Sequence, residues 1–420
     1  MPSVKSASIV GAGIAGLTAA LALARKGIAV HVLEQAPALE EVGAGLQLSP
    51  NASRILTQLG LLDALAARWS EPDHILLSSG HALAPLASVP AGAAARGRWG
   101  APYGVLHRAS LQAVLLDAVS REPLCTLTTG RRIETAEHAL EQVQQRRAAA
   151  LHPELRETEG PGRFHGSQKN ENDLVAAPAD LVIAADGVWS QLRQGVPGAL
   201  PARYSGTIAW RFLVPYGAAP PFLNPRTVTA FLGPQAHLVA YPLAEAQAFN
   251  IVALHAHRQA PAAGWSRKGD AAARARLLDA FSGWHADIRQ LLAEARDPLM
   301  WPLFECPDGA WTDGGKTVLI GDAAHAMTPF AAQGAAMAIE DAALLANRLA
   351  RASDTGQALR HFEATRRERI ARVRSRGAFN RFAYHARGPI ALTRNLVLSL
   401  RGPESLAADL DWLYGYRTPD

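Results

Sequence analysis

SIVGAGIAGL, residues 8–17, sets the architecture of this chain. Its first residues predict a short strand that runs into the pattern Gly-x-Gly-x-x-Gly, and an alanine-rich helix pattern follows as far as Lys26. A second apolar run, from Ala29 to Leu33, ends at Glu34. A strand, a tight turn, a helix and a second strand with an acid at its tip form a dinucleotide-binding unit. The segment therefore predicts a Rossmann-like α/β domain.

Each glycine of this pattern has a physical role. Gly11 permits the sharp turn, Gly13 lets the backbone approach a pyrophosphate, and Gly16 allows the helix to pack closely on the strand. The first helical turn, Ile14-Ala15, directs free N–H groups and the positive end of the helix dipole towards the phosphates. We therefore treat all five residues as candidates for cofactor binding.

The acid at the strand tip narrows the choice of nucleotide. Glu34 follows Gly16 by 18 residues, which places it to accept hydrogen bonds from a ribose diol. A carboxylate there repels a 2′-phosphate, so the pattern favours an adenosine without that phosphate. FAD and NAD both meet this condition, and the motif does not choose between them.

The composition is that of a soluble globular enzyme of one large unit or two domains. The chain has 420 residues, of which 49% are hydrophobic and 19% charged. The formal charge of +5 is small for this length and indicates an ordinary basic surface, compatible with steering of anionic substrates. The two cysteines, Cys125 and Cys306, lie far apart and lack ligand spacing, so we expect neither a disulfide framework nor a metal site.

We expect a cytoplasmic protein that neither enters a membrane nor binds nucleic acid. No signal-peptide pattern precedes the first predicted strand. No apolar run reaches the roughly 20 residues that a membrane-spanning helix needs. Residues 361–381 predict a helix with seven arginines among acids, which indicates a solvated helix or an oligomer face rather than a nucleic-acid surface. This segment therefore also allows a homodimer.

The middle of the chain predicts a second domain, a β-sheet laid against the first. Runs with the strand pattern lie between Gly/Pro turns at 207–214, 227–232, 237–241 and 249–254. Further predicted elements are short strands within 75–89, a helix over 271–296 and a buried strand over 317–320. Residues 131–178 are polar without a clear period, and they predict an extended hairpin or a mobile insertion.

Four other positions carry local signals. Gly45 closes a glycine-rich turn that predicts a second close backbone approach, with a plain turn as the alternative. Arg108 stands near the start of a predicted helix, where it opposes the helix dipole unless an anion is bound; a surface salt bridge is its alternative. Asp186 and Asp322 each follow a buried-strand pattern. For Asp322, a simple helix cap is the alternative to cofactor contact.

Three segments in order carry a resemblance to a known family. Residues 11–34, Asp186-Gly187 and the segment from Gly321-Asp322-Ala323-Ala324-His325 to Gly334 together resemble the single-component FAD-dependent aromatic hydroxylases, the class A flavoprotein monooxygenases. The similarity covers nearly the whole chain. Residues 206–211 and 236–242 resemble the branch that acts on hydroxylated aromatic acids, such as salicylate, 3-hydroxybenzoate and 6-hydroxynicotinate.

The resemblance implies bound FAD and a transient nicotinamide co-substrate. In the family, the segment around Pro329 and Gln333-Gly334 lies beside the flavin ring, where backbone N–H groups stabilise the anionic reduced form. His325 is expected to orient this loop rather than react. The residues that we assign to FAD are Gly11, Gly13, Ile14, Ala15, Gly16, Glu34, Gly45, Arg108, Asp186, Asp322, Pro329, Gln333, Gly334 and Ala335.

The resemblance also implies a substrate site on the second sheet. His237 and Tyr241 are four residues apart, so on one strand both face the same side. In the family branch, a histidine of near-neutral pKa deprotonates the phenol and a tyrosine holds its polar groups. A surface histidine and a core tyrosine are the structural alternative. Further candidates for substrate contact are Gln47, Arg211 and Pro329; Arg211 would touch the flavin or a carboxylate, or form a structural salt bridge.

Together these features predict an FAD-dependent monooxygenase that hydroxylates a small hydroxylated aromatic acid with NADH or NADPH and O₂, by way of a flavin C4a-hydroperoxide. The open alternatives are a hydroxylase of a non-carboxylated phenol or heterocycle, a flavin reductase or dehydrogenase on the same scaffold, and a flavin-binding sensor. We expect FAD-binding segments at 1–75, 104–190 and 301–350, substrate-domain segments at 76–103 and 191–300, and C-terminal helices at 351–420.

Overall fold

The computed structural model describes residues 3–39, 45–141, 179–259 and 267–419. Most of the predicted insertion at 131–178 lies outside these ranges. The glycine-rich segment forms β1 (Ser6–Val10), α1 (Ile14–Ala24) and β2 (Ala29–Leu33), as the sequence predicts. β1 pairs in parallel with β2, so the local strand–helix–strand unit is the centre of the first sheet.

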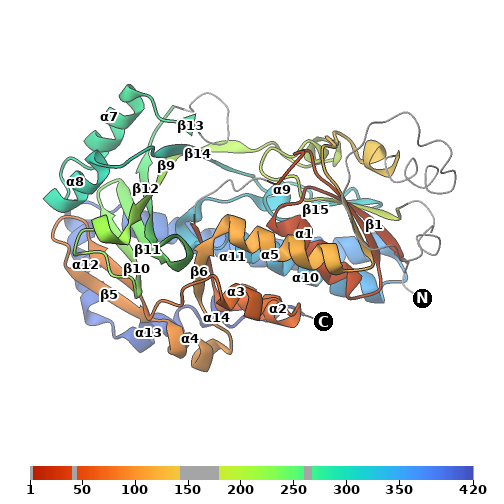
Figure 1. Ribbon diagram of the computed structural model, residues 1–420, viewed down its shortest axis with the longest axis horizontal. Coiled ribbons are helices and arrows are strands. Elements are labelled where there is room, and N and C mark those ends of the chain that lie inside the picture. Colours follow the sequence, from red (N-terminus) through yellow and green to blue (C-terminus); the bar gives the residue numbers. More distant parts are fainter. Residues whose placement is uncertain (1–2, 40–44, 142–178, 260–266, 420) are drawn as a thin grey trace.

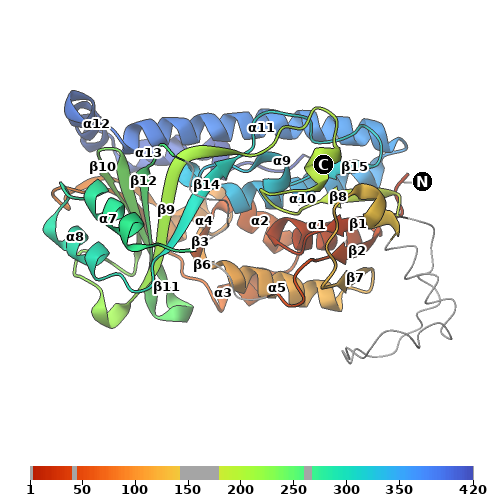
Figure 2. The same cartoon turned by 90° about the horizontal axis from the view of Figure 1, so that it is seen from above.

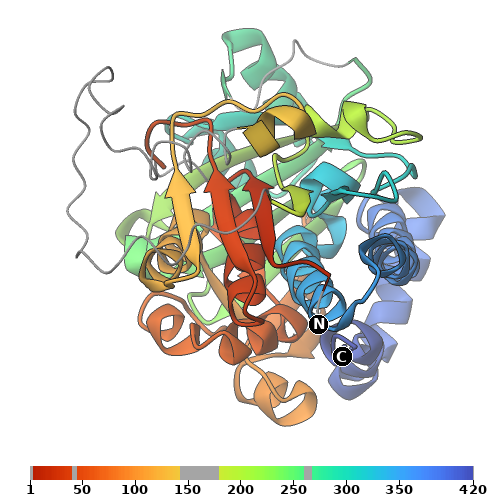
Figure 3. The same ribbon diagram turned by 90° about the vertical axis from the view of Figure 1, so that its right-hand side faces the viewer.

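The first sheet has five parallel strands in the order β15-β8-β1-β2-β7. Figure 3 shows its strands side by side from one end of the molecule. The added strands are β7 (Cys125–Thr128), β8 (Leu181–Ala184) and β15 (Thr317–Leu319). Central strands of a parallel sheet are covered on both faces, which is why β8 is entirely apolar and buried. This confirms the predicted Rossmann-like α/β class.

The second sheet has eight strands in the order β13-β14-β9-β12-β11-β10-β4-β5 and lies at the opposite end of the molecule (Figure 1). Its strands are β4 (His74–Ser79), β5 (Pro85–Pro90), β9 (Arg203–Pro215), β10 (Thr227–Gly233), β11 (Ala236–Leu243), β12 (Ala248–Ala256), β13 (Arg267–Lys268) and β14 (Leu299–Glu305). All the strands predicted from the alternating pattern are present. β14 crosses residue 300, where we expected a domain boundary.

One predicted helix is wrong: residues 271–296 form two helices, α7 (Ala271–Ala280) and α8 (Ala286–Ala293). The break carries Gly283, a residue that disfavours helix interiors. It also lets Trp284 turn inward, where its ring lies against the backbone of Gly80 and Gly233. The packing of the Trp284 ring into the space beside these two glycines therefore outweighs the helix propensity of the surrounding residues.

The remaining elements connect and cover the two sheets. They are β3 (Gly45–Leu48), α2 (Pro50–Gln58), α3 (Leu62–Ala66), α4 (Gly92–Trp99), β6 (Gly104–His107), α5 (Arg108–Arg121), η3 (Leu192–Gly195), η4 (Tyr216–Ala218), η5 (Ala244–Ala246), α9 (Asp322–His325), η6 (Pro329–Ala331), α10 (Gly334–Arg351), α11 (Thr355–Tyr384), α12 (Gly388–Leu400), α13 (Pro403–Ala408) and α14 (Asp411–Tyr414). Figure 2 shows α11 running along one side of the molecule. None of the helices within the described ranges is long and apolar enough to cross a membrane.

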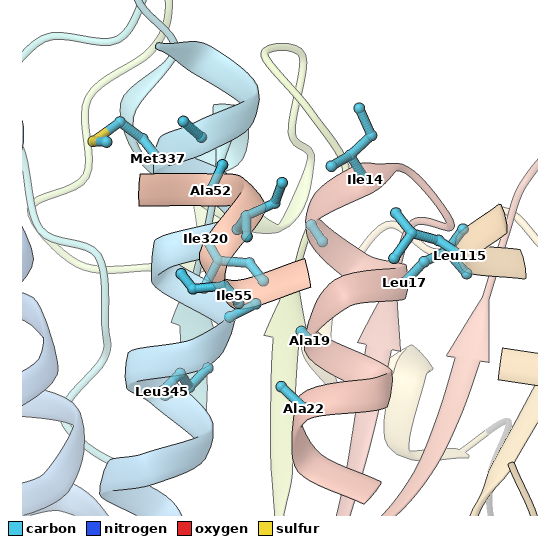
Figure 4. Packing of buried hydrophobic residues seen from close by; sticks show 14 of the residues in the cluster. Ile14, Leu17, Ala19, Ala22, Ala52, Ile55, Leu115, Ile320, Met337 and Leu345 are labelled. Atoms are coloured by element: carbon cyan, nitrogen blue, oxygen red, sulfur yellow. The ribbon is translucent and has the colours of Figure 1, made fainter. Parts of the chain in front are cut away.

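The main core joins the parallel sheet to the helices beside it. Figure 4 shows Ala19 and Ala22 on the side of α1 that faces Ile55 of α2 and Leu345 of α10, and Leu17 on its other side beside Leu115 of α5; all of them are buried. A second core cluster lies between the eight-stranded sheet and helices α7 and α8. The main cluster also includes residues of the second sheet, such as Val252 and Leu254, which line a cavity between the two sheets.

The arginine-rich segment of α11 is not simply solvated, which corrects our prediction for two of its residues. Arg366 is fully buried and donates to Asp341 and Glu340 of α10, in each case over 2.6 Å. Arg369 is also buried and donates to Glu340 over 2.9 Å. These ion pairs connect α11 to α10, because two buried carboxylates need cationic partners. Other arginines of α11, such as Arg372, are exposed.

Candidate active site

Three helices begin at one cavity of about 270 Å³, which is lined by residues of the second sheet, by β3 and by loops that follow strands of the first sheet. Gly13 and the first turn of α1, Arg108 at the start of α5, and Gly334 at the start of α10 all line it. The predicted site residues that line the cavity are Gly13, Ile14, Ala15, Gly45, Gln47, Arg108, Arg211, His237, Tyr241, Asp322, Pro329, Gly334 and Ala335. Residues more than 300 positions apart in the sequence therefore share one site.

The glycine turn has room for a pyrophosphate. A Cβ atom added at Gly13 meets nothing within 4 Å, whereas one at Gly11 would lie 2.4 Å from the carbonyl oxygen of Ala185. At Gly16 the added Cβ would lie 1.9 Å from the carbonyl oxygen of Gly11. Gly11 and Gly16 are thus required by the chain itself, while the space at Gly13 is left to a ligand. Helix N-termini favour anions, so the residues present fit FAD.

Replacing Gly13 with Val should therefore separate cofactor binding from folding. We expect the purified Gly13→Val protein to lose most of its FAD. Its affinity for FAD should fall at least about tenfold, because the loss of one hydrogen bond to a phosphate costs about 1.5–3 kcal/mol of binding free energy. The apoprotein should keep its melting temperature within a few degrees. Gly16→Val is the matched control and should destabilise the apoprotein. Flavin absorbance and thermal unfolding measure the two effects, and an unstable Gly13→Val apoprotein would contradict this division.

Two predicted cofactor residues lie beside this turn rather than on the cavity wall. Glu34 accepts the backbone N–H of Ala12 over 2.8 Å and that of Ala36 over 2.9 Å, so it holds the two strand ends together. Asp186 accepts the backbone N–H of Gln191 over 2.9 Å through Oδ2. Its Oδ1 is buried without a hydrogen-bond partner among the described residues, and burial raises the pKa of this carboxyl. Such an atom suits a hydroxyl donor from the cofactor.

The loop from Gly321 to His325 is held from behind by Asp341. This carboxylate accepts the backbone N–H of Gly321 over 2.8 Å and lies 2.6 Å from Nε2 of His325. Burial acts to raise the pKa of Asp341, but the adjacent His325 and Arg366 outweigh it and hold this pKa below its usual value. His325 is 1% exposed and does not line the cavity. It therefore orients the loop, as expected.

Gln333 departs from the other loop residues. Its side chain is buried and donates to Ser49 over 3.0 Å, and its Oε1 accepts from Asn51 over 3.2 Å. The side chain is therefore taken up by α2 and its cap. At this position, therefore, only the backbone of the loop and Gly334 can make the contacts with the cofactor that the sequence predicts.

The substrate candidates lie on the face of the second sheet that meets the cavity. His237, Val239 and Tyr241 alternate along β11 and all line it, which confirms that the histidine and the tyrosine share one face. Strand register places Val239 opposite Val252 of β12, and Val252 opposite Arg211 of β9. The sheet thus brings an imidazole, a phenol and a guanidinium to one wall.

Arg211 is a cation without a carboxylate partner among the described residues. Its Nε is buried and makes no hydrogen bond there, and its guanidinium lies over the ring of Trp301 at 5.3 Å. Burial lowers the pKa of this guanidinium, against an opposing effect of Tyr241. Arginine stays protonated in proteins. The site therefore holds a positive charge that a bound anion would satisfy.

His237 is 2% exposed, and its Nδ1 lies 2.9 Å from Nε2 of His385. Burial lowers the pKa of His237 well below its usual value, and His385 lowers it further. The near-neutral pKa that we expected is therefore wrong, because the sequence does not show how completely this ring is removed from water. A neutral imidazole is nevertheless the form that accepts a proton.

The two histidines should make the fold less stable in acid. Burial lowers the pKa of His385 to about 4, with Arg381 and His255 adding to the shift. Unfolded histidines bind a proton below about pH 6.5. Between about pH 6.5 and 4 the unfolded chain thus binds more protons than the folded chain, so the free energy of unfolding falls with the pH. Melting temperatures should show a shallower decline for His385→Asn; an identical decline would contradict this origin.

Sequence reasoning missed two residues of the site. His385 directly follows α11 and reaches His237 across 148 positions. Tyr103 donates its hydroxyl to Oε1 of Gln47 over 2.5 Å, which fixes the amide of Gln47 at the cavity wall. Neither lies in a motif. An isolated histidine at a helix end was the only available signal, and it does not show what the side chain faces.

Comparisons with known proteins agree on one family. The family described as "FAD binding domain" matches residues 4–376. The chain is 34% identical to 3-hydroxybenzoate 6-hydroxylase 1 of Aquipseudomonas alcaligenes, over 98% of this chain and 97% of the relative. It is 35% identical to 3-amino-4-hydroxybenzoate 2-monooxygenase of Streptomyces cremeus, over 97% and 94%. A salicylate hydroxylase–substrate complex has the same fold, with a TM-score of 0.73 at 22% identity over 99% of this chain and 96% of that chain.

Proposed function

This chain belongs to the FAD-binding-domain family and is an FAD-dependent aromatic hydroxylase, and we propose that its substrate is a hydroxybenzoate-type aromatic acid. The observation that carries the proposal is Arg211, a partly enclosed cation beside His237 and Tyr241. A carboxylate is the group that pairs best with a planar guanidinium. The names of the similar hydroxybenzoate enzymes point to the same substrate class.

Bound FAD supplies the oxygen chemistry of the reaction and is reduced by NAD(P)H. We infer that the starts of α1 and α10 hold its charged parts, with Arg108 as an additional cation. The cavity wall between them is apolar at Val239, Val252 and Leu254. These side chains exclude water from the reacting atoms, which strengthens each polar contact inside the site.

The polar residues of β11 are assigned to the substrate hydroxyl. His237 accepts the phenol proton, and the resulting phenolate pushes electron density into the ring carbon that is hydroxylated. Burial raises the pKa of Tyr241, so this phenol stays protonated and donates a hydrogen bond to the substrate. Arg211 holds the carboxylate at the other side. The substrate is thus oriented by two groups and activated by a third.

The first experiment is NADH oxidation by the FAD-loaded protein with a panel of hydroxybenzoates, hydroxynicotinates and carboxyl-free phenols, with product and peroxide measured. Strong stimulation by one acid, with hydroxylated product and little peroxide, supports the proposal and names the substrate. Stimulation only by carboxyl-free phenols would overturn the role of Arg211. NADH oxidation that passes electrons to another acceptor, without O₂ use, would favour the reductase alternative.

His237→Ala should lower hydroxylation about 10²-fold at pH 7, the usual contribution of a general base. FAD content should change little, because His237 lies on the sheet and not on the helix N-termini. The loss should shrink as the pH rises towards the phenol's own pKa of about 10, since solvent then removes the proton. Turnover measured from pH 6 to 10 tests this, and an equal loss at every pH would contradict the base assignment.

Three properties remain predictions: the use of NADH rather than NADPH, assembly as a homodimer, and a cytoplasmic location. NADH is favoured only by the family resemblance, since Glu34 is assigned to FAD, so NADH and NADPH should be compared directly in the same assay. Light scattering on the FAD-loaded protein measures the oligomeric state.

A further inference from the structure

A pair of hydrogen-bonded histidines connects the cavity to the outside of the protein. His237 of β11 lines the cavity. His385, which follows the last residue of α11, lines a separate surface depression together with Arg381 and Ala386. The two rings meet at 2.9 Å, from Nδ1 of His237 to Nε2 of His385. Together they span the wall between substrate and solvent.

The pair is built into the fold rather than being a chance contact. The backbone carbonyl of His385 accepts the N–H of Gln235, in the turn before β11, over 3.2 Å. The ring of Phe330 lies 5.1 Å from that of His237 and 5.4 Å from that of His385, and Tyr384 lies 5.5 Å from His237. Among the described residues, His385 is the only hydrogen-bond partner of the His237 ring. Within the described part of the chain, a proton on His237 thus has one hydrogen-bonded path away from the cavity.

We propose that His385 is a relay residue that passes the substrate proton from His237 to solvent. The proposal rests on the proposed function of His237. The phenol O–H bond breaks and an N–H bond forms at Nε2 of His237; the proton on its Nδ1 moves to Nε2 of His385, and His385 releases its Nδ1 proton to water. No electrons are transferred. The reverse steps, as protonated product leaves, restore both tautomers.

The charges around His385 favour release over storage of the proton. Arg381 of α11 and His255 of β12 both lower the pKa of His385, in addition to burial. Tyr384 is neutral, because burial raises the pKa of its hydroxyl. At neutral pH both imidazoles are therefore uncharged, and a proton that reaches His385 moves on to water. A buried base without such an exit would stay charged after one transfer.

The relay can be tested without hydroxylation. We would mix FAD-loaded protein with 3-hydroxybenzoate in a stopped-flow instrument and follow phenolate absorbance in dilute buffer. His385→Ala should ionise the bound phenol at least about tenfold more slowly, a lower bound for a lost proton-transfer group. Its dissociation constant for the acid should stay within about twofold. Added imidazole should restore the rate. His257→Ala is the matched control and should behave as wild type, because the ring of His257 bonds the carbonyl oxygen of Gln259 and has no hydrogen bond to His237 or His385 among the described residues.

The outcomes separate this inference from the proposed function. An unchanged ionisation rate in His385→Ala, at low buffer concentration, would overturn the relay. So would wild-type protein that binds the acid without ionising it, whereas hydroxylation in the substrate panel would still support the proposed function. If His385→Ala does not fold, ¹⁵N NMR of wild-type histidines decides: ligand binding should switch the tautomers of His237 and His385 together, and a switch in His237 alone would contradict the relay.

Discussion

Arg366→Met should lower the free energy of unfolding by about 3–5 kcal/mol, the usual effect of breaking a buried ion pair. Arg366 has no exposed area and holds Asp341 and Glu340, which are equally buried. Methionine fills a similar volume but leaves the carboxylates with less compensation, so the loss is electrostatic. Urea denaturation measures it. Arg121→Met, which breaks an exposed pair with Asp117, is the control and should cost at most about 1 kcal/mol.

The same substitution should weaken FAD binding. Asp341 also holds Gly321 and His325, the loop that carries Asp322 at the cavity. A carboxylate that loses Arg366 takes up a proton more easily and holds the loop less firmly. The variant should therefore release FAD at a lower urea concentration than that of global unfolding. Equal effects of Arg366→Met and Arg121→Met would contradict the structural role of this cluster.

Arg211→Gln should reduce kcat/KM for a hydroxybenzoate by roughly 10²–10³-fold, since truncating one partner of an enclosed charge pair costs about 2–5 kcal/mol. The reason is specific to the carboxylate. A carboxyl-free phenol makes no such pair, so its kcat/KM should change far less. Steady-state kinetics on both compounds, normalised to bound FAD, measures the difference. Equal losses for both would move Arg211 from the substrate to the cofactor.

Much of the architecture could be predicted because its signals are local. The turn at Gly11–Gly16 requires glycines for contacts within one strand–helix unit, so the pattern is legible in a few consecutive residues. The period of two along β11 likewise fixes that His237 and Tyr241 share a face. The order of the three segments at 11–34, 186–187 and 321–334 carries the family resemblance that implies FAD. Local geometry does not, however, reveal a helix break such as the one at Gly283, which depends on Trp284 filling space beside distant glycines.

The chemistry of the site depends on pairs that the sequence keeps far apart. His385 reaches His237, and Arg366 reaches Asp341, only because α11 packs along α10 and ends beside the turn that precedes β11. The pKa of His237 is likewise a property of its surroundings, since burial and a second imidazole shift it. Chain-local patterns specify which strands and turns form. Burial and long-range contact, which exist only once those elements pack, specify which charges are paired and where a proton can go.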